Sequence, residues 1–154
     1  YPWPMMRLSE LYLNYAEALN EVSGPSLEVY DAMNKIRERA GIPTVQEAWS
    51  DVAYAATPNK HTSKEGLREI IRQERMIELA FEGHRYYDIR RWKLAEEYFT
   101  TPIKGWSVNE ETEANYYQVT DVSQRAFNAP RDYLQPISFI ELSRNPNLIQ
   151  NPGW

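Results

Sequence analysis

The feature of this 154-residue sequence that most constrains its fold is a pair of helical patterns separated by a short break. Between Met6 and Val22, apolar side chains recur at steps of three and four, which is the stripe of an amphipathic helix. Gly24 and Pro25 follow this stripe. They end a helix because glycine adopts the left-handed cap and proline cannot extend the hydrogen-bond ladder. A first helix is therefore predicted over residues 6–22.

A second helix is predicted directly afterwards, over residues 26–40, and Gly41 followed by Pro43 closes it. Its apolar stripe consists of Val29, Ala32, Met33, Ile36 and Ala40. Because only a few residues join the two helices, they should pack as an antiparallel αα-hairpin over residues 6–41. One such hairpin cannot bury its faces alone, so it has the character of one repeat in a helical array.

A long helix is predicted over residues 63–99, and Thr62 with Glu65 has the spacing of a capping box at its start. The stripe expected to be buried consists of Leu67, Ile70, Ile71, Ile77 and Phe81. Gly83 interrupts the pattern, either as a kink or as a cap, and helical periodicity then resumes to residue 99.

Two segments have no helical periodicity, namely residues 42–62 and a variable loop region over residues 100–130. Within the second segment, residues 116–122 alternate well enough for one short strand. The fold class predicted from these patterns is mainly α, with irregular loops and at most one or two short strands.

The region over residues 131–154 is predicted to hold one short helix followed by turns. Ser138 and Glu141 have the spacing of a capping box for a helix over residues 139–143. Asparagine, proline and glycine then recur as in turns, so this end of the sequence is too regular for a disordered tail.

Composition and missing motifs exclude several classes of function. The sequence has no cysteine, which excludes a disulfide scaffold, a thiolate metal site and a cysteine nucleophile within these residues. A net charge of -5 without a basic tract argues against a nucleic-acid partner. Phosphate-binding glycine loops and the common hydrolase and metalloprotease motifs are also missing. We therefore expect no enzyme, no cofactor and no metal site.

The densest group of charges lies between residues 72 and 91 and could carry chemistry. Three of its carboxylates, Glu74, Glu78 and Glu82, are four residues apart and line one flank of the predicted helix. They could serve as the carboxylate pair of a glycoside hydrolase or as metal ligands. Against this, Glu82 and His84 have the wrong spacing for a di-metal helix motif, and an arginine within reach lowers the pKa of each carboxylate.

We therefore expect a structural ion network rather than a catalytic site, since structural pairs are the commoner case. Its members are Glu74, Arg75, Glu78, Glu82, Arg85, Asp88 and Arg91.

Aromatic residues make up 13% of the chain and fall into two sets. Tyr12, Tyr15, Phe81 and Tyr87 lie on helical stripes, where core packing is the expected role. The second set lies in irregular segments among polar residues. Rings in such loops suit a ligand-binding surface, but they could equally staple the loops to the helices, and the two interpretations stay open. The ligand-binding candidates are Trp49, Tyr54, Trp106, Tyr116 and Tyr117.

Four segments, in order along the chain, resemble the C-terminal part of SusD/RagB-type outer-membrane lipoproteins. They are RLSELYLNYAEALN at 7–20, NKIRERAGIP at 34–43, RQERMIELAFEGHRYYDIRRW at 72–92, and the ending with LQPI at 134–137 and RNPNLIQNPGW at 144–154. The order and spread of these matches make the resemblance specific, and it covers residues 7–154.

The resemblance implies a fold of tetratricopeptide-like helical hairpins, here one hairpin plus a long helix. It also implies that residues 1–154 form a single C-terminal region of a larger protein. Such proteins, typical of Bacteroidetes, are surface-exposed lipoproteins of the outer membrane, tethered by an N-terminal lipid that would lie outside this chain. They take part in polysaccharide utilisation, since they capture glycans, or sometimes peptides, for nutrient uptake through a SusC-like TonB-dependent transporter.

The resemblance assigns no binding residue, because the sugar-stacking rings of characterised relatives lie largely in segments before this one. The leading hypothesis is glycan binding at the cell surface and delivery to the transporter, without cofactors or covalent chemistry. The alternative is a helical-repeat protein–protein adaptor that has no glycan site in this portion.

Overall fold

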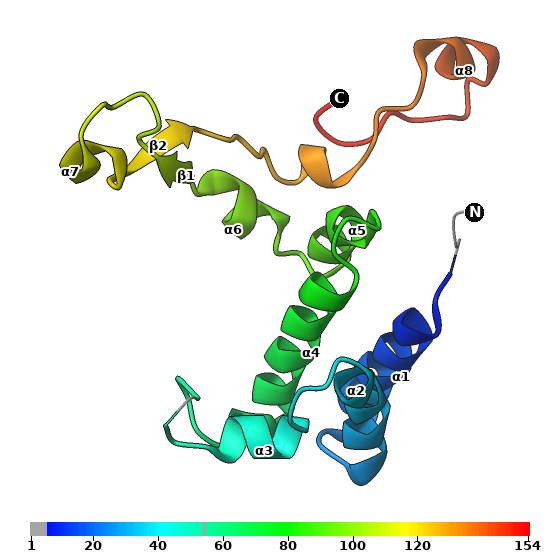
Figure 1. Cartoon of the computed structure of the whole chain (residues 1–154). Coiled ribbons are helices and arrows are strands. Elements are labelled where there is room, and N and C mark those ends of the chain that lie inside the picture. Colours follow the sequence, from blue (N-terminus) through cyan, green and yellow to red (C-terminus); the bar gives the residue numbers. More distant parts are fainter. Residues whose placement is uncertain (1–5, 54) are drawn as a thin grey trace, which may run out of the picture. The chain divides into compact units, whose positions relative to one another are not determined.

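The computed structural model describes residues 6–53 and 55–154, which divide into two compact units between Arg85 and Tyr86. Described residues are mainly helical and contain one two-stranded sheet, as predicted (Figure 1). The N-terminal unit holds α1 (Leu8–Ser23), α2 (Leu27–Arg39), α3 (Val45–Ser50), a 3₁₀ turn (Lys60–Thr62) and α4 (Lys64–Glu78). Around and after the boundary lie α5 (His84–Arg91), α6 (Ala95–Thr100), β1 (Ile103–Trp106), α7 (Glu113–Tyr116), β2 (Val119–Ser123), a 3₁₀ turn (Arg131–Tyr133) and α8 (Phe139–Arg144).

The predicted hairpin is formed by α1 and α2, with a tight link between them. Gly24 has a φ of 76°, and its N–H donates to the carbonyl of Asn20 at 2.9 Å, which ends α1. The side chain of Ser26 then accepts from the N–H of Val29 at 3.4 Å and begins α2. The local signals at Gly24, Pro25 and Ser26 therefore determine where α1 ends and where α2 begins.

The core of the N-terminal unit lies where α4 packs beside the hairpin (Figure 1). Its buried members come from α1, α2, α3 and α4, and they are Ala16, Val29, Ala32, Met33, Val45, Leu67, Ile70 and Ile71. Burial of apolar surface of this extent is the main stabilising contribution to the unit.

The segment 63–99 is divided among three helices, where one interrupted helix was predicted. After α4, Phe81 has a φ of 65° and Gly83 a φ of 83°; after α5, Lys93 has a φ of 58°. A residue at positive φ cannot continue a right-handed helix, so each of these positions forces a break. Phe81, at the first break, is exposed, and so is Ile77 inside α4. Neither belongs to the buried stripe that was predicted for them.

The capping box predicted at Thr62 is also wrong by one residue. Ser63 is the N-cap of α4, and its side chain accepts from the N–H of Gly66 at 3.0 Å. The hydroxyl of Thr62 instead donates to the carbonyl of Asn59 at 2.8 Å, inside the preceding turn.

In the C-terminal unit, β1 and β2 pair in antiparallel fashion and α7 lies in the loop that joins them (Figure 1). The strand predicted over 116–122 therefore begins later, at Val119, because Tyr116 belongs to α7. The core of this unit is small. It consists of Ile89, Ala95 and Phe127, with Phe99 and Tyr133 packed against them.

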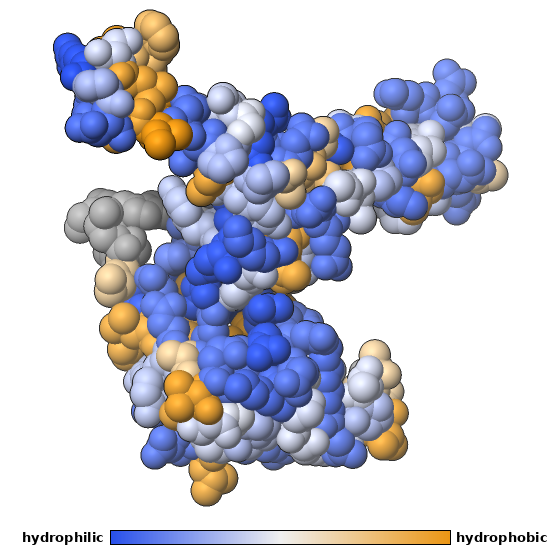
Figure 2. Space-filling view, turned by 180° about the vertical axis from the view of Figure 1, so that it is seen from behind, coloured by the Kyte–Doolittle hydropathy of each residue, from blue (hydrophilic) through white to orange (hydrophobic). Residues whose placement is uncertain are grey.

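The short helix predicted at 139–143 is α8, but its cap differs from the prediction. Ser138 makes no side-chain cap, and its backbone carbonyl accepts from the N–H groups of Glu141 and Leu142. Hydrophobic side chains of this end, Phe139, Ile140 and Ile149, are exposed, and Figure 2 shows the hydrophobic colouring there at the upper left. Within the described part of the chain, no helix combines the length and the apolar character that a membrane span needs.

Candidate functional site

Three carboxylates of the charge group, Glu74, Glu78 and Glu82, bind arginines that lie in α2 or directly before α1. Arg7, just before α1, holds Glu78 at 2.9 Å and Glu82 at 2.7 Å, while Arg39 of α2 holds the same oxygen of Glu78 at 2.6 Å. Arg37 pairs with Glu74. These contacts tie α4 and the residues after it to the hairpin.

The remaining members of the predicted network are placed as follows. Arg75 is buried and lies between Asn14, whose side-chain oxygen is 2.6 Å away, and Glu17, at 3.7 Å. Asp88 is buried in α5 and pairs with Arg91 at 2.9 Å. Arg85 of α5 is half-buried and has a partner of its own. The geometry thus favours a structural role, since these groups bind one another.

Glu74 differs from the sequence-based expectation in its pKa. Burial raises the pKa of Glu74 above its ordinary value, and the neighbouring Arg37 offsets this shift only in part. A lowered pKa was predicted for it.

Glu74, Glu78 and Glu82 each bind an arginine. Among the described residues, no three histidine, aspartate or glutamate side chains gather as metal ligands.

The rings predicted to build the core do so only in part. Tyr12 is half-buried and packs against the core of the N-terminal unit, as predicted. Tyr15, Phe81 and Tyr87 are exposed, and for them the prediction is wrong. The helical stripe of α1 is wider than the face that α2 and α4 cover, which leaves Tyr15 outside, and the break after α4 turns Phe81 outward.

Trp49 was predicted to lie in an irregular segment, but it lies in the helix α3 and packs against the core of the N-terminal unit. The Lys60 ammonium lies 5.6 Å from the centroid of its ring. The backbone carbonyl of Trp49 accepts a hydrogen bond from the N–H of Asn59 at 2.7 Å. This placement favours the stapling role for Trp49. Tyr54 lies outside the described residues.

The other three candidates, Trp106, Tyr116 and Tyr117, lie together in the C-terminal unit, and we call them the hairpin aromatic cluster. The ring of Tyr117 is 5.8 Å from that of Trp106 and 5.3 Å from that of Tyr116, both edge-to-face. Their exposed fractions are 54% for Trp106, 38% for Tyr116 and 61% for Tyr117.

Pairing of the strands brings these rings together. Trp106 ends β1 opposite Val119 of β2, and α7 ends directly before Tyr117. A hydrogen bond of 3.0 Å from the N–H of Ser107 to the carbonyl of Gln118 closes the base of the loop. The rings are thus held by backbone structure and keep their surfaces open to solvent.

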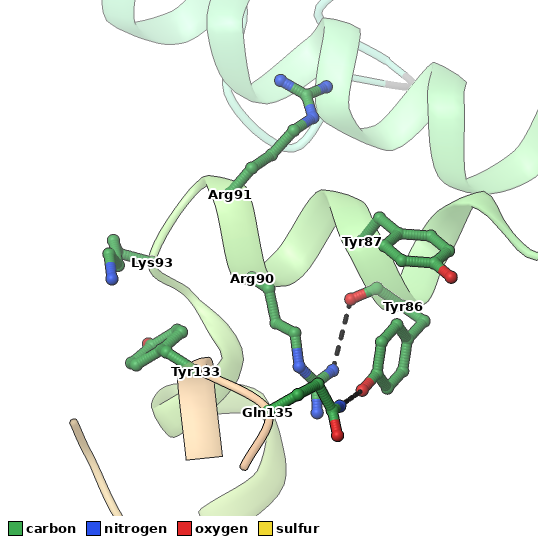
Figure 3. A pocket seen from close by; sticks show the side chains of 7 residues that line it. All are labelled: Tyr86, Tyr87, Arg90, Arg91, Lys93, Tyr133 and Gln135. Carbon is green, nitrogen blue, oxygen red and sulfur yellow. Dashed lines mark hydrogen bonds between the residues drawn. The ribbon is translucent and has the colours of Figure 1, made fainter. Parts of the chain in front are cut away.

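The structure also contains a cavity of about 770 Å³ in the C-terminal unit, which we call the α5 pocket. Its lining residues are Tyr86, Tyr87, Arg90, Arg91, Lys93, Tyr133 and Gln135. In Figure 3, Gln135 donates to the hydroxyl of Tyr86 at 3.1 Å, and Arg90 donates to the carbonyl of Tyr86 at 3.2 Å. The Gln135 bond joins α5 to the segment that follows the second 3₁₀ turn, and the Arg90 bond lies within α5.

Sequence reasoning missed the α5 pocket. Tyr86 and Arg90 are four apart on one helix, which is a local signal for a ring–cation pair. Tyr133 and Gln135 come from a segment more than forty residues away that has no periodic pattern. Only the fold could bring them to this helix.

Comparison with known proteins identifies the family that has this architecture. The SusD family model matches residues 1–154. The chain is 39% identical over 150 residues to SusD-like protein P2 of Formosa agariphila, covering 97% of this chain and 25% of that protein.

Two solved structures from Bacteroides fragilis are similar as well. One is a SusD-like protein, 38% identical, with a TM-score of 0.76 over 99% of this chain and 26% of that one. The other is a SusD-like carbohydrate-binding protein, 33% identical, with a TM-score of 0.66 over 92% of this chain and 27% of that one. The chain spans about a quarter of the length of these relatives. By sequence and by fold, this chain belongs to the SusD family.

Proposed function

We propose that the protein binds a glycan at the cell surface and delivers it to a SusC-like TonB-dependent transporter. Membership of the SusD family supports the proposal, as does the similarity to a SusD-like carbohydrate-binding protein. In this proposal residues 1–154 form a C-terminal region of a larger lipoprotein of the outer membrane, anchored by an N-terminal lipid outside this chain.

The hairpin aromatic cluster is the observation that carries glycan binding to particular residues of this chain. Tryptophan and tyrosine present rigid rings whose faces pack against the C–H groups of a sugar, while their polar atoms and neighbouring amides bind hydroxyls. Trp106 and Tyr117 are more than half exposed and are fixed by the strands and α7. Such a preformed surface loses little conformational entropy when a ligand binds.

Binding without covalent chemistry fits the carboxylates of the N-terminal unit. A glycoside hydrolase needs one carboxyl group free to act as nucleophile or base and another to act as acid. Glu74, Glu78 and Glu82 bind arginines instead. We therefore propose a binding protein rather than an enzyme.

Calorimetric titration of the full-length protein with a panel of oligosaccharides, polysaccharides and peptides tests this function. We expect binding to at least one glycan, and Trp106→Ala should weaken it by about tenfold or more, as hot-spot rings do. Val108→Ala is the matched control, because Val108 is exposed to a similar extent in the loop that follows Trp106 but has no ring. Failure of the full-length protein to bind any member of the panel would overturn the proposal.

The second candidate is a protein–protein adaptor without a glycan site in this portion. The exposed apolar side chains of the α8 end, Phe139, Ile140 and Ile149, favour it, since such side chains mark contact surfaces. If it holds, Trp106→Ala leaves glycan uptake unchanged, whereas Phe139→Ser abolishes copurification of a partner protein.

A further inference from the structure

The α5 pocket has cationic side chains without a carboxylate in its lining. Of its seven lining residues, three are cations, namely Arg90, Arg91 and Lys93, and none is acidic. Arg91 pairs with Asp88, and in Figure 3 it points to the opposite side of α5 from Arg90. Arg90 and Lys93 are therefore the cations that matter for the pocket.

Neither of these two cations is neutralised by an ion pair with a described residue. Across residues 6–53 and 55–154, no carboxylate oxygen lies within 4.0 Å of the Arg90 guanidinium or the Lys93 ammonium. The carboxylate of Asp132 interacts electrostatically with Arg90 without forming an ion pair with it. Its oxygens are engaged by Arg131 at 2.7 Å and by the N–H of Asn128 at 2.7 Å.

Ring contacts hold both cations in place without cancelling their charge. The guanidinium of Arg90 lies 3.6 Å from the ring centroid of Tyr86, and the ammonium of Lys93 lies 4.1 Å from that of Tyr133. Arg90 uses one N–H on the carbonyl of Tyr86, which leaves further donors of its planar fork directed away from that bond. A guanidinium held in this way is suited to bind a planar or tetrahedral oxyanion.

The pocket also offers an exposed ring beside the cations. Tyr87 is exposed, and its ring lies edge-to-face with that of Tyr86 at 5.1 Å. A sugar stacked on this ring would place its substituents near the pocket wall. The volume of about 770 Å³ is within the range of sites for small ligands.

From this arrangement we propose that the α5 pocket binds the anionic substituent of an acidic glycan, a uronate carboxylate or a sulfate ester. The proposal rests on the proposed function and narrows its substrate class. A neutral sugar would leave both cations without a counter-charge, whereas an acidic one gains charge-assisted hydrogen bonds with them. Uronate and sulfate share this chemistry, and the experiment separates the two.

Matched pairs of oligosaccharides test the proposal by calorimetric titration of the full-length protein. One pair is oligogalacturonate and its carboxyl-reduced form, and the other is a sulfated galactan oligosaccharide and its desulfated form. We expect the acidic member of at least one pair to bind about tenfold more tightly than its neutral form, with a preference that falls as salt rises. Which pair shows the preference identifies the anion.

Variants locate the preference in the pocket. Arg90→Gln and Lys93→Gln should each remove most of it, while Arg90→Lys should keep part of it because the charge remains. Arg144→Gln is the matched control, since it removes one exposed cation of α8 outside the pocket, and it should keep the full preference. Thermal unfolding of each variant shows that it folds.

The outcomes separate this proposal from the proposed function. Equal binding of acidic and neutral members in both pairs, or a preference that survives Arg90→Gln and Lys93→Gln in folded protein, overturns the anion site and leaves glycan binding standing. Absence of binding to every saccharide overturns both proposals together.

Discussion

The two units of this chain use similar residue types in different ways. In the N-terminal unit, four helices share a continuous apolar core, and its arginines bind carboxylates from neighbouring helices. In the C-terminal unit the buried core is limited to Ile89, Ala95 and Phe127, while rings and cations line a pocket or lie on the surface. The difference indicates that the first unit is a scaffold and that the second carries side chains able to contact a ligand.

Two arginines show the contrast most clearly. Arg37 is buried and pairs with Glu74, so its charge is neutralised inside the scaffold. Arg90 lies on the ring of Tyr86 and forms no ion pair with a described residue. A buried arginine that pairs with a carboxylate has its charge neutralised by that partner. A cation held on a ring remains able to bind an anion.

The largest effect that this comparison predicts is the loss of a core side chain in the scaffold. Leu67 is fully buried, so Leu67→Ala should lower the free energy of unfolding by about 3 kcal/mol, through lost burial and the cavity left behind. Chemical denaturation measures this. Val119→Ala, on an exposed position of β2, is the control and should cost less than about 1 kcal/mol. A Leu67→Ala cost as small as the control would contradict a scaffold built on this core.

A smaller effect is expected from the ion pairs, and the two units offer a matched pair of variants. Glu78 has 13% of its side chain exposed and binds both Arg7 and Arg39, so Glu78→Gln should cost about 2 kcal/mol. Glu141 pairs with Arg144, but the two side chains are 56% and 73% exposed, so Glu141→Gln should cost less than about 0.5 kcal/mol.

Chemical denaturation of both glutamine variants checks this, and glycan titration should be unchanged in Glu78→Gln. Similar costs for the two variants would mean that the ion pairs do not distinguish the units. Loss of binding in folded Glu78→Gln would give this carboxylate a role in ligand binding that we do not assign to it.

The smallest effect concerns the pH dependence of the scaffold. Burial raises the pKa of Glu74 in the folded protein above its ordinary value of 4.5. Between that value and the raised one, the folded protein holds more protons than the unfolded chain, so this group's contribution to stability falls as pH rises. Denaturation from pH 4 to pH 7 should therefore show a less negative slope in Glu74→Gln than in the wild type.

Glu21 gives the opposite sign and serves as the comparison. A hydrogen bond from Arg68 lowers the pKa of Glu21, so its contribution is present above pH 4.5 and is lost as pH falls through the lowered value. Below pH 4.5, where the wild type loses this contribution, stability should rise less steeply with pH in Glu21→Gln than in the wild type. Slopes that move in the same direction in the two variants would contradict this assignment.

Sequence reasoning predicts the hairpin well, because its signals are local. Gly24, Pro25 and Ser26 act on adjacent residues, and α1 and α2 begin and end within two residues of the predicted bounds. The division of residues 63–99 was not predicted in full, since Phe81 and Lys93 take a positive φ that is rare for such residues.

The candidate sites show the same limit. Trp106, Tyr116 and Tyr117 were recognised as loop rings, but their assembly depends on the pairing of β1 with β2. The α5 pocket depends on a contact between α5 and Gln135, and no periodic pattern links two such distant segments. Sequence identifies residue types suited to a ligand, and the fold determines which of them meet.

Hydroxyl-radical footprinting of the full-length protein, with and without a saturating glycan, tests the division into scaffold and ligand-contacting unit most directly. The readout is the oxidation rate of each tryptophan and tyrosine. We predict that the glycan protects Trp106 and Tyr117 and leaves Trp49 and Tyr15 unchanged. Protection at Trp49 or Tyr15, with none at Trp106 and Tyr117, would contradict the account.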